Sequence, residues 1–181
     1  MVYVLLADGF EEIEAVAPID LMRRAGIEVK TVGIGSRAVR GSHGIYLEAD
    51  ILSDSVELDG TLEGIVLPGG SRGAQNLDKS DFTGKAVRFA FENGAVVAAI
   101  CAAPYVLGHI GVLKGKRATC YPGFENELTG AEYTAQSVSV DGKLITANGA
   151  GSAVEFGAAL VSVLVSSDKS SEILKGIQYS E

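Results

Sequence analysis

The sequence has no long apolar run, which limits the classes of protein it can represent. Its most apolar stretches, such as Val2 to Ala7 and Val161 to Val165, are far shorter than the roughly 20 residues of a membrane-spanning helix. Met1 is followed at once by a predicted strand, so no secretory signal peptide is visible. We therefore expect a cytoplasmic location and no membrane partner.

Basic charge is also scarce in this chain. It has 15 lysines and arginines against 23 acidic residues, for a formal net charge of -8 at pH 7, and no run of basic residues offsets this locally. Proteins that bind nucleic acids neutralise phosphates with clustered Lys and Arg. We expect no nucleic-acid-binding surface, and the expected partners are small metabolites or another protein.

Cysteine and histidine, the usual metal ligands, are few. Without an export signal, Cys101 and Cys120 are expected to be free thiols rather than a disulfide. The two histidines, His43 and His109, lie far apart in sequence and form no familiar zinc spacing. The sequence thus predicts neither a metal nor a cofactor.

The order of apolar segments indicates an α/β fold. With 181 residues, 47% of them hydrophobic, the chain is expected to form one domain over residues 1–181. A strand near residues 2–6, a helix near 13–25 and a strand near 28–33 form a βαβ unit. Apolar runs at 64–67 and 95–100 lack polar alternation, which is typical of strands covered on both faces. We expect a mostly parallel central sheet with helices on both faces.

Two further segments predict β-hairpins. Between Ser36 and Leu52, Gly41 and Gly44 interrupt alternating residues, which suggests a small antiparallel hairpin attached to the main sheet. Near the C-terminus, Asp141-Gly142 joins two alternating runs and is the strongest hairpin signal in the chain. A last long helix is expected over residues 152–165, followed by a short terminal helix.

The segment "AAICAAP", residues 98–104, places Cys101 where a buried strand is expected to end. A free cysteine is most often a small buried hydrophobe. However, small residues on both sides resemble a nucleophile elbow, and Pro104 suits the first turn of a helix. A thiol at a helix N-terminus is expected to have a lowered pKa. Cys101 is therefore the candidate nucleophile.

A second strand is followed by Pro68-Gly69-Gly70. Backbone N–H groups without side chains in the way can form an oxyanion hole together with those near Cys101. Taken alone, such a tripeptide is typical of an ordinary turn. Its occurrence at a neighbouring strand end favours the functional interpretation, since ligands bind outside the carboxyl ends of parallel strands.

The acid–base partner of Cys101 is harder to assign. His109 lies eight residues further along the same helix, about 12 Å along its axis, so a packing role is expected. His43 lies in the predicted hairpin, where solvent exposure is favoured slightly over a place in the site. Three glutamates open the first helix. We expect Glu11 and Glu12 in solvent and Glu14 tilted inward, with a raised pKa that suits a proton carrier.

Four ordered motifs together resemble the ThiJ/PfpI superfamily, in the branch of the human Parkinson-disease protein deglycase and the bacterial glyoxalase III homologues. They are "LLADGFEEIEAVAPIDLMRRAG", "VLPGG" followed by "GAQNL", "AAICAAP" and "ANGAGSAVEF". The resemblance implies a flavodoxin-like three-layer sandwich, a class I glutamine amidotransferase-like domain, a homodimer, and a reactive cysteine hydrogen-bonded to a protonated glutamate.

Carried over by motif, the nucleophile is Cys101, the glutamate is Glu14, and the backbone N–H groups of Gly70 and Ala102 form the anion pocket. The chain departs from the family pattern in two respects. Tyr121 stands where many members have a histidine, which puts a cysteine–histidine pair in doubt. The resemblance also implies that His43 and Asn148 replace two arginines of the anion pocket.

The leading functional hypothesis is a glutathione-independent enzyme that converts methylglyoxal or glyoxal to the 2-hydroxy acid. Removal of early glycation adducts from proteins or nucleotides uses the same first step. The alternative is a sensor of oxidative stress, or a chaperone, that acts through oxidation of Cys101. A cysteine peptidase or amidotransferase is weaker, because Ala102 rather than histidine follows the cysteine and no downstream His-Glu pair exists.

Overall fold

The computed structural model describes residues 1–179, and its centre is a seven-stranded sheet in the order β10-β11-β7-β6-β1-β2-β5. Six strands run parallel, and β10 pairs antiparallel with β11 at one edge. The strands of this sheet are β1 (Val2–Leu6), β2 (Val29–Gly33), β5 (Ile51–Leu52), β6 (Gly64–Leu67), β7 (Val96–Ile100), β10 (Val138–Asp141) and β11 (Leu144–Ala147). The predicted mostly parallel sheet is confirmed.

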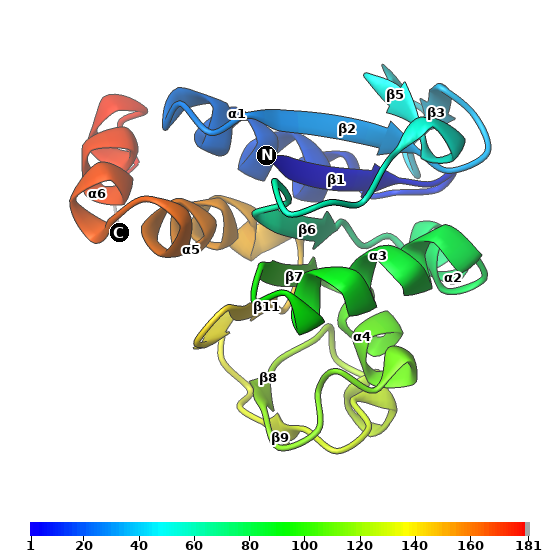
Figure 1. Ribbon diagram of the computed structural model, residues 1–181. Helices are drawn as coiled ribbons and strands as arrows, with labels where there is room; N and C mark the ends of the chain where they lie inside the picture. Colours follow the sequence, from blue (N-terminus) through cyan, green and yellow to red (C-terminus); the bar gives the residue numbers. More distant parts are fainter. Residues whose placement is uncertain (180–181) are drawn as a thin grey trace.

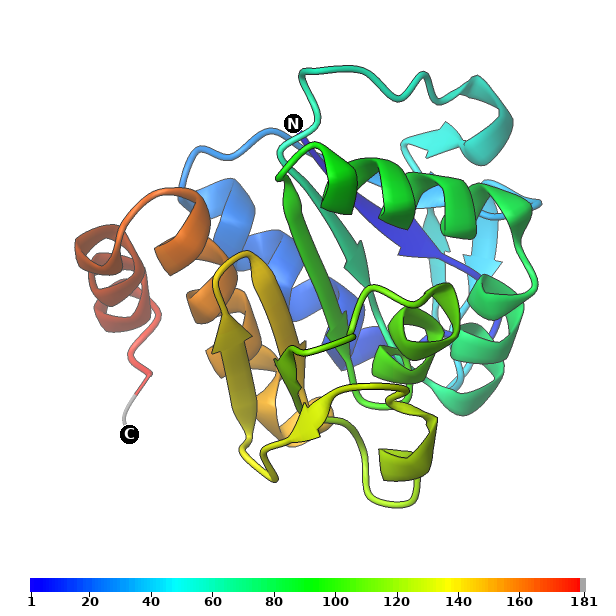
Figure 2. The same cartoon turned by 60° about the horizontal axis from the view of Figure 1, so that its bottom comes forward.

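Helices cover both faces of the sheet, as Figures 1 and 2 show from two directions. One layer contains α1 (Glu12–Arg24) and α5 (Ala153–Leu164), with α6 (Ser167–Gly176) packed against α5. The opposite layer contains α2 (Ser71–Asp78), α3 (Asp81–Glu92) and α4 (Pro104–Ile110). Short 3-10 helices lie at Ser53–Ser55, Glu125–Glu127 and Ala150–Ser152.

The alternation of side chains along each strand creates two hydrophobic cores. In β1, Val2, Val4 and Leu6 pack with residues of α1 and α5, whereas Tyr3 and Leu5 belong to the cluster under α2, α3 and α4. A strand covered on both faces must be apolar throughout. This explains why the central strands show no polar alternation in the sequence.

Both predicted hairpins form. The first consists of β3 (Ala38–Arg40) and β4 (Tyr46–Glu48), an antiparallel pair that is a sheet of its own, while β5 just after it joins the main sheet. The second hairpin joins β10 to β11 across Asp141 and Gly142. Outside the main sheet, β8 (Arg117–Ala118) pairs parallel with β9 (Glu132–Tyr133).

The topology places a crevice beside Cys101. From β1 the chain crosses to β2 on one side, whereas β6, β7 and β11 extend the sheet on the other side. The loops after β1 and β6 therefore diverge, and ligands bind at such a switch point. Among the described residues, no helix is both long and apolar enough to cross a membrane.

Candidate active site

Cys101 lies at the sharp bend between β7 and α4. Its backbone has a left-handed conformation, with φ of 64°, which is uncommon for a residue with a side chain. Its N–H donates to the carbonyl of Ala147 at 2.8 Å, and its own carbonyl accepts from the N–H of Tyr121 at 2.8 Å. Backbone bonds to two neighbouring segments thus hold the thiol at the sheet edge.

Glu14, on the first turn of α1, is the buried acid of the site. Only 1% of the residue is exposed, and its Oε2 accepts the N–H of Gly69 at 2.9 Å. Its other oxygen, Oε1, is buried and has no hydrogen-bond partner among residues 1–179. The carboxyl therefore has hydrogen-bonding capacity that Gly69 does not use, and it interacts with the thiol of Cys101.

Gly69 allows the carboxyl and the thiol to approach each other. A Cβ at this position would lie 2.5 Å from Oε2 of Glu14 and 2.7 Å from the Cβ of Cys101. Such contacts are far inside van der Waals distance, so no side chain fits between the two groups. The lack of a side chain at Gly69, in the predicted glycine turn, therefore permits the close approach of Glu14 and Cys101.

The carboxyl and the thiol influence each other's ionisation. Burial raises the pKa of Glu14 to about 7, although the contact with Cys101 and the N–H of Gly69 act in the opposite direction. Burial, followed by the negative charge of Glu14, raises the pKa of the Cys101 thiol to about 12. Above about pH 7 the pair therefore carries one proton and one negative charge.

The expectation of a lowered thiol pKa at a helix N-terminus is wrong for this structure. Helix α4 begins only at Pro104, three residues after Cys101, and proline has no N–H to offer. The N–H groups of Gly70 and Ala102 do lower the pKa of the thiol, but burial and Glu14 outweigh them. Proton transfer to Glu14, rather than free ionisation, is the route to a thiolate.

The N–H groups of Gly70 and Ala102, which come from two different segments, both lower the pKa of the Cys101 thiol. Gly70 precedes α2 with a φ of 83°, and a Cβ there would lie 2.3 Å from the carbonyl oxygen of Gly9. Only glycine fits this close approach. The two donors point at the sulfur, where a negatively charged oxygen could also be stabilised.

The structure corrects the placement of Glu12. This residue is only 7% exposed rather than in solvent, and it holds the β3–β4 hairpin. Its Oε1 accepts the N–H of His43 at 2.8 Å and that of Ile45 at 3.3 Å. Burial opposes ionisation, but hydrogen bonds from the backbone of Glu12 itself, His43 and Ile45 and from the His43 ring outweigh it and lower the pKa of Glu12 to about 2.

Glu11 is also less exposed than expected, with 16% of its side chain accessible. Its Oε2 accepts from the hydroxyl of Ser42 at 2.9 Å. His43 itself is exposed, as expected, yet its ring lies 3.1 Å from Glu12. The hydrogen bond to Glu12, then the charges of Glu11 and Glu12, raise the pKa of His43.

A cavity of about 770 Å³ opens above Cys101. Walls come from the loop after β1, the β3–β4 hairpin, the start of α2 and the segment after β8. The lining residues are Asp8, Gly9, Glu11, Ala38, Arg40, Gly41, Ser42, His43, Tyr46, Gly70, Ser71, Arg72, Cys101, Ala102, Tyr121 and Phe124. Of the candidate residues from the sequence, Cys101, Gly70, Ala102, Tyr121 and His43 thus share one cavity.

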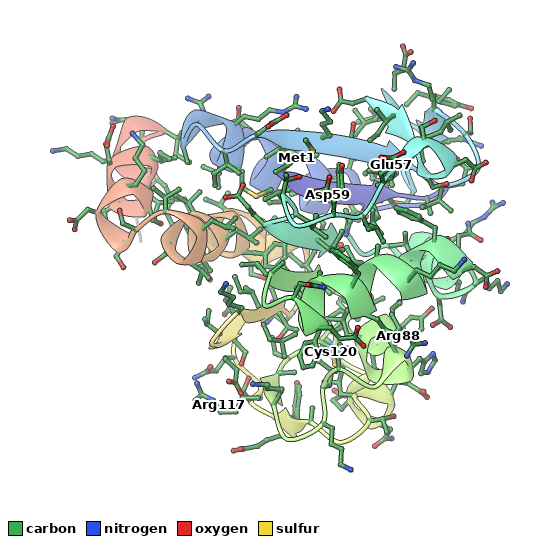
Figure 3. All side chains as sticks on the ribbon, in the orientation of Figure 1. Met1, Glu57, Asp59, Arg88, Arg117 and Cys120 are labelled. Carbon is green, nitrogen blue, oxygen red and sulfur yellow. The ribbon has the colours of Figure 1, made fainter. Side chains whose placement is uncertain are left out.

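Glu14 and Gly69 lie next to Cys101 but do not line the cavity, and the N–H of Gly69 is bound to Glu14 and not open to an oxyanion. The other candidates lie elsewhere. Asn148 does not line this cavity, and its Oδ1 accepts from the hydroxyl of Ser152 at 3.0 Å. His109 is held at the end of α4 between Asp78 and Glu127, in the packing role expected for it. Cys120, a free thiol like Cys101, is fully buried in the interior near α4 (Figure 3).

Two cations on the cavity wall were not predicted from the sequence. Arg40 ends β3, and Arg72 is the second residue of α2. A signal for Arg72 existed, because it directly follows Pro68-Gly69-Gly70-Ser71 at a helix start. For Arg40 no local signal existed, since the hairpin is held over the site by long-range contacts with the loop after β1 and the start of α1.

The chain is similar in sequence to known proteins. A model described as "DJ-1/PfpI family" matches residues 1–163. Protein dj-1beta of Drosophila melanogaster is 37% identical over 177 residues, which cover 96% of this chain and 94% of that protein. A protein of Pyrococcus abyssi named a deglycase is 31% identical over 147 residues, covering 80% of this chain and 87% of its own.

The fold has similar solved structures. That of "Toxoplasma gondii DJ-1, oxidized" superposes with a TM-score of 0.95 at 35% sequence identity, covering 99% of this chain and 98% of its own. The likeness therefore extends over the whole described fold, including the segments that surround Cys101.

Proposed function

The chain belongs to the DJ-1/PfpI family, and from this premise we propose that it is a cysteine-dependent enzyme that converts methylglyoxal or glyoxal to the corresponding 2-hydroxy acid without glutathione. The observation that carries the proposal is the pair of Cys101, which lines an open cavity, and the buried Glu14 that interacts with its thiol. A nucleophile and a proton carrier in contact are the minimum that this reaction needs.

The proposed reaction begins with addition of Cys101 to the aldehyde carbon. The S–C bond forms, the carbonyl π bond breaks, and the thiol proton moves to Glu14 and on to the new alkoxide, giving a hemithioacetal. The N–H groups of Gly70 and Ala102 stabilise the negative oxygen while it forms. No oxidant or reductant is consumed in this step.

Glu14 then moves a second proton. Its carboxylate takes the proton from the former aldehyde carbon, and the resulting enediol is reprotonated at the neighbouring carbon, leaving a thioester on Cys101. Water hydrolyses the thioester, which releases the 2-hydroxy acid and restores the thiol. The sum is dicarbonyl plus water to hydroxy acid, with one acid–base group in every step.

Deglycation is the related activity that the same site supports. The Pyrococcus abyssi relative is named a deglycase. Early adducts of dicarbonyls on amines carry the same two-carbon unit, and loss of the amine would lead to the same thiol adduct. We include such adducts on proteins or nucleotides among the proposed substrates.

Oxidation sensing is the second candidate function, and a specific observation favours it. The Toxoplasma gondii relative is described as oxidized. In this chain, two equivalents of hydrogen peroxide would convert the Cys101 thiol to a sulfinate and water. A protonated Glu14 and the N–H groups of Gly70 and Ala102 are suitable donors to the sulfinate oxygens.

A product assay distinguishes the two candidates. We expect the purified protein to convert methylglyoxal to lactate without glutathione, as followed by NMR. If methylglyoxal disappears only into reversible adducts and no lactate forms, the proposed enzyme activity is contradicted. Gain of two oxygen atoms on Cys101 at low peroxide, with no lactate formed, would favour the sensor.

A homodimer is part of the proposal, supported by an apolar stripe on α1. Ile13, Val16 and Ala17 follow helical spacing along α1, and Ile13 and Val16 are 56% and 45% exposed. With Ile45 and Leu47 of the hairpin they line a groove of about 460 Å³. A second copy of the chain would cover these apolar side chains.

We expect Val16→Glu to convert a dimer to a monomer, because it places a charge in the centre of this apolar stripe. The measurement is the solution mass by light scattering. Val165→Glu is the matched control, since Val165 is 51% exposed but lies at the end of α5. A wild-type protein that is a monomer at micromolar concentration would contradict the proposed dimer.

The cytoplasm is the proposed compartment, because the reaction requires Cys101 as a free thiol. Both Cys101 and Cys120 are free in the structure.

A further inference from the structure

We propose that Arg40 and Arg72 form an anion-binding subsite on the wall of the Cys101 cavity, and that the physiological substrate carries a phosphate monoester in addition to its reactive carbonyl. This inference rests on the proposed function, since it names the substrate class of the same site. It concerns residues outside the cysteine, the glutamate and the oxyanion donors already described.

The size of the cavity is the first observation. A volume of about 770 Å³ is far more than a three-carbon dicarbonyl occupies. It falls in the range of roughly 300–1,000 Å³ that is typical of sites for drug-sized ligands. The space above Cys101 therefore accommodates a substrate with a substantial group beyond the reacting carbonyl.

The second observation is the pairing of the arginines. The chain has seven, all within the described residues. Five of them use their guanidinium group in a hydrogen bond or an ion pair: Arg23, Arg24, Arg37, Arg88 and Arg117. Arg88 lies beside α4 and Arg117 at the periphery near β8, both on the side opposite β3 (Figure 3).

For the guanidinium groups of Arg40 and Arg72, no hydrogen bond or ion pair is found within residues 1–179, and these two arginines are the ones that line the cavity. Arginines elsewhere on this acidic surface have found acceptors. Both side chains are exposed on the cavity wall, so two guanidinium groups from different elements are available to an anionic group of a ligand.

The carboxylates of the cavity do not supply that acceptor. Asp8 binds the backbone N–H of Arg40 at 2.9 Å, which fixes the hairpin rather than the side chain. Glu11 accepts from the hydroxyl of Ser42 at 2.9 Å and lies 3.4 Å from the ring of His43. Both acids thus bind groups of the hairpin and leave the two guanidinium groups free.

Arg72 is also held in place at its base. Gly9 packs so closely against it that a Cβ on Gly9 would lie 2.7 Å from the Cβ of Arg72 and 3.0 Å from its Cγ. The side chain therefore leaves α2 along the loop after β1, toward the cavity. Ser71, the neighbouring residue at the start of α2, lines the same cavity and adds a hydroxyl donor.

The number of donors favours phosphate over carboxylate. Each guanidinium presents a fork of N–H groups that matches two oxygens of an anion. A phosphate monoester, with three terminal oxygens and up to two negative charges, matches two such forks better than a carboxylate with two oxygens and one charge. The positive end of the helix dipole at the N-terminus of α2 also favours the negative charge of a phosphate.

Alkylation of Cys101 tests the subsite independently of catalysis. Bromohydroxyacetone phosphate and bromohydroxyacetone both alkylate a thiol with loss of bromide, and they differ only in the phosphate. We expect the phosphate reagent to label Cys101 at least about tenfold faster, the effect of roughly one charge-assisted hydrogen bond. Labelling is followed by mass spectrometry at fixed ionic strength.

The double variant Arg40→Gln/Arg72→Gln should reduce this preference to near unity while iodoacetamide still alkylates Cys101 at the wild-type rate. Arg24→Gln/Lys85→Gln removes the same charge outside the cavity and should keep the preference. The labelling rate of iodoacetate relative to iodoacetamide measures the preference for a carboxylate. We expect this rate ratio to be smaller than that of the phosphate reagent relative to bromohydroxyacetone.

An unchanged preference in the Arg40→Gln/Arg72→Gln variant would overturn the subsite, as would equal labelling by the two reagents in the wild type. A larger gain for iodoacetate than for the phosphate reagent would overturn the choice of phosphate. Failure of the proposed reaction has a different signature, because absence of lactate from methylglyoxal leaves the alkylation preference intact.

Discussion

Cys101→Ser is expected to reduce the conversion of methylglyoxal to lactate at least about 10³-fold, to the level of the uncatalysed reaction. Every proposed step passes through a bond to sulfur, and a serine hydroxyl at this position is a much weaker nucleophile than a thiol. The substitution changes one atom and keeps the backbone bonds to Ala147 and Tyr121. The fold should therefore be preserved, which thermal unfolding can verify.

Cys120→Ser is the matched control for the loss of a thiol. Cys120 is fully buried and does not line the cavity, so its variant is expected to keep turnover near the wild-type value. If Cys101→Ser retained substantial lactate formation, Cys101 would not be the nucleophile. If Cys120→Ser lost activity while remaining folded, the assignment of the reaction to Cys101 alone would be wrong.

Glu14→Gln is expected to lower kcat/KM by about 10²- to 10⁴-fold, the usual contribution of a positioned acid–base group. Glutamine has the same shape, and its amide oxygen can still accept the N–H of Gly69. It cannot take a proton from the thiol or from the carbon of the hemithioacetal. Glu92→Gln, at an exposed end of α3, controls for the loss of one surface charge.

The pH profile adds a second readout for Glu14. Below about pH 7 both groups of the pair are protonated, so no base is present to accept the thiol proton. We expect kcat/KM of the wild type to rise with pH through a midpoint near 7, and this rise to vanish in Glu14→Gln. A wild-type profile flat from pH 5 to 9 would contradict this role of Glu14.

The same shift predicts the sign of a stability change. The pKa of Glu14 is raised from 4.5 to about 7 by folding, so the folded state binds the proton more tightly than the unfolded state. The contribution is complete below about pH 4.5 and is lost as pH rises through about 7. Glu14→Gln removes this part of the pH dependence of the unfolding free energy.

Much of the fold was predictable because its signals are local. Apolar runs without alternation marked β6 and β7 as strands covered on both faces, and Asp141-Gly142 marked the turn between β10 and β11. The status of β3 and β4 as a sheet of their own was not predictable. The two strands pair through their own residues, but the position of the hairpin depends on bonds to residues far away in the sequence, among them Glu12.

The candidate site was predictable in part for the same reason. Strand ends and glycines placed Cys101, Gly69 and Gly70 together, and the spacing on the first helix favoured an inward Glu14. The error for Glu12 arose because helical spacing alone does not reveal a hairpin that folds over that face. The predicted lowering of the Cys101 thiol pKa was wrong because burial and a neighbouring carboxyl raise the pKa. Both are tertiary effects, which the position of a residue near a helix N-terminus does not reveal.

The left-handed backbone at Cys101 has a consequence for how this chain could change over time. A residue with a side chain costs of order 1–3 kcal/mol in such a conformation, and glycine would relieve much of that cost. Mutational drift under selection for thermal stability alone would therefore favour glycine at position 101. Retention of cysteine there in a lineage would be a signature of selection on chemistry, measurable without knowledge of the substrate.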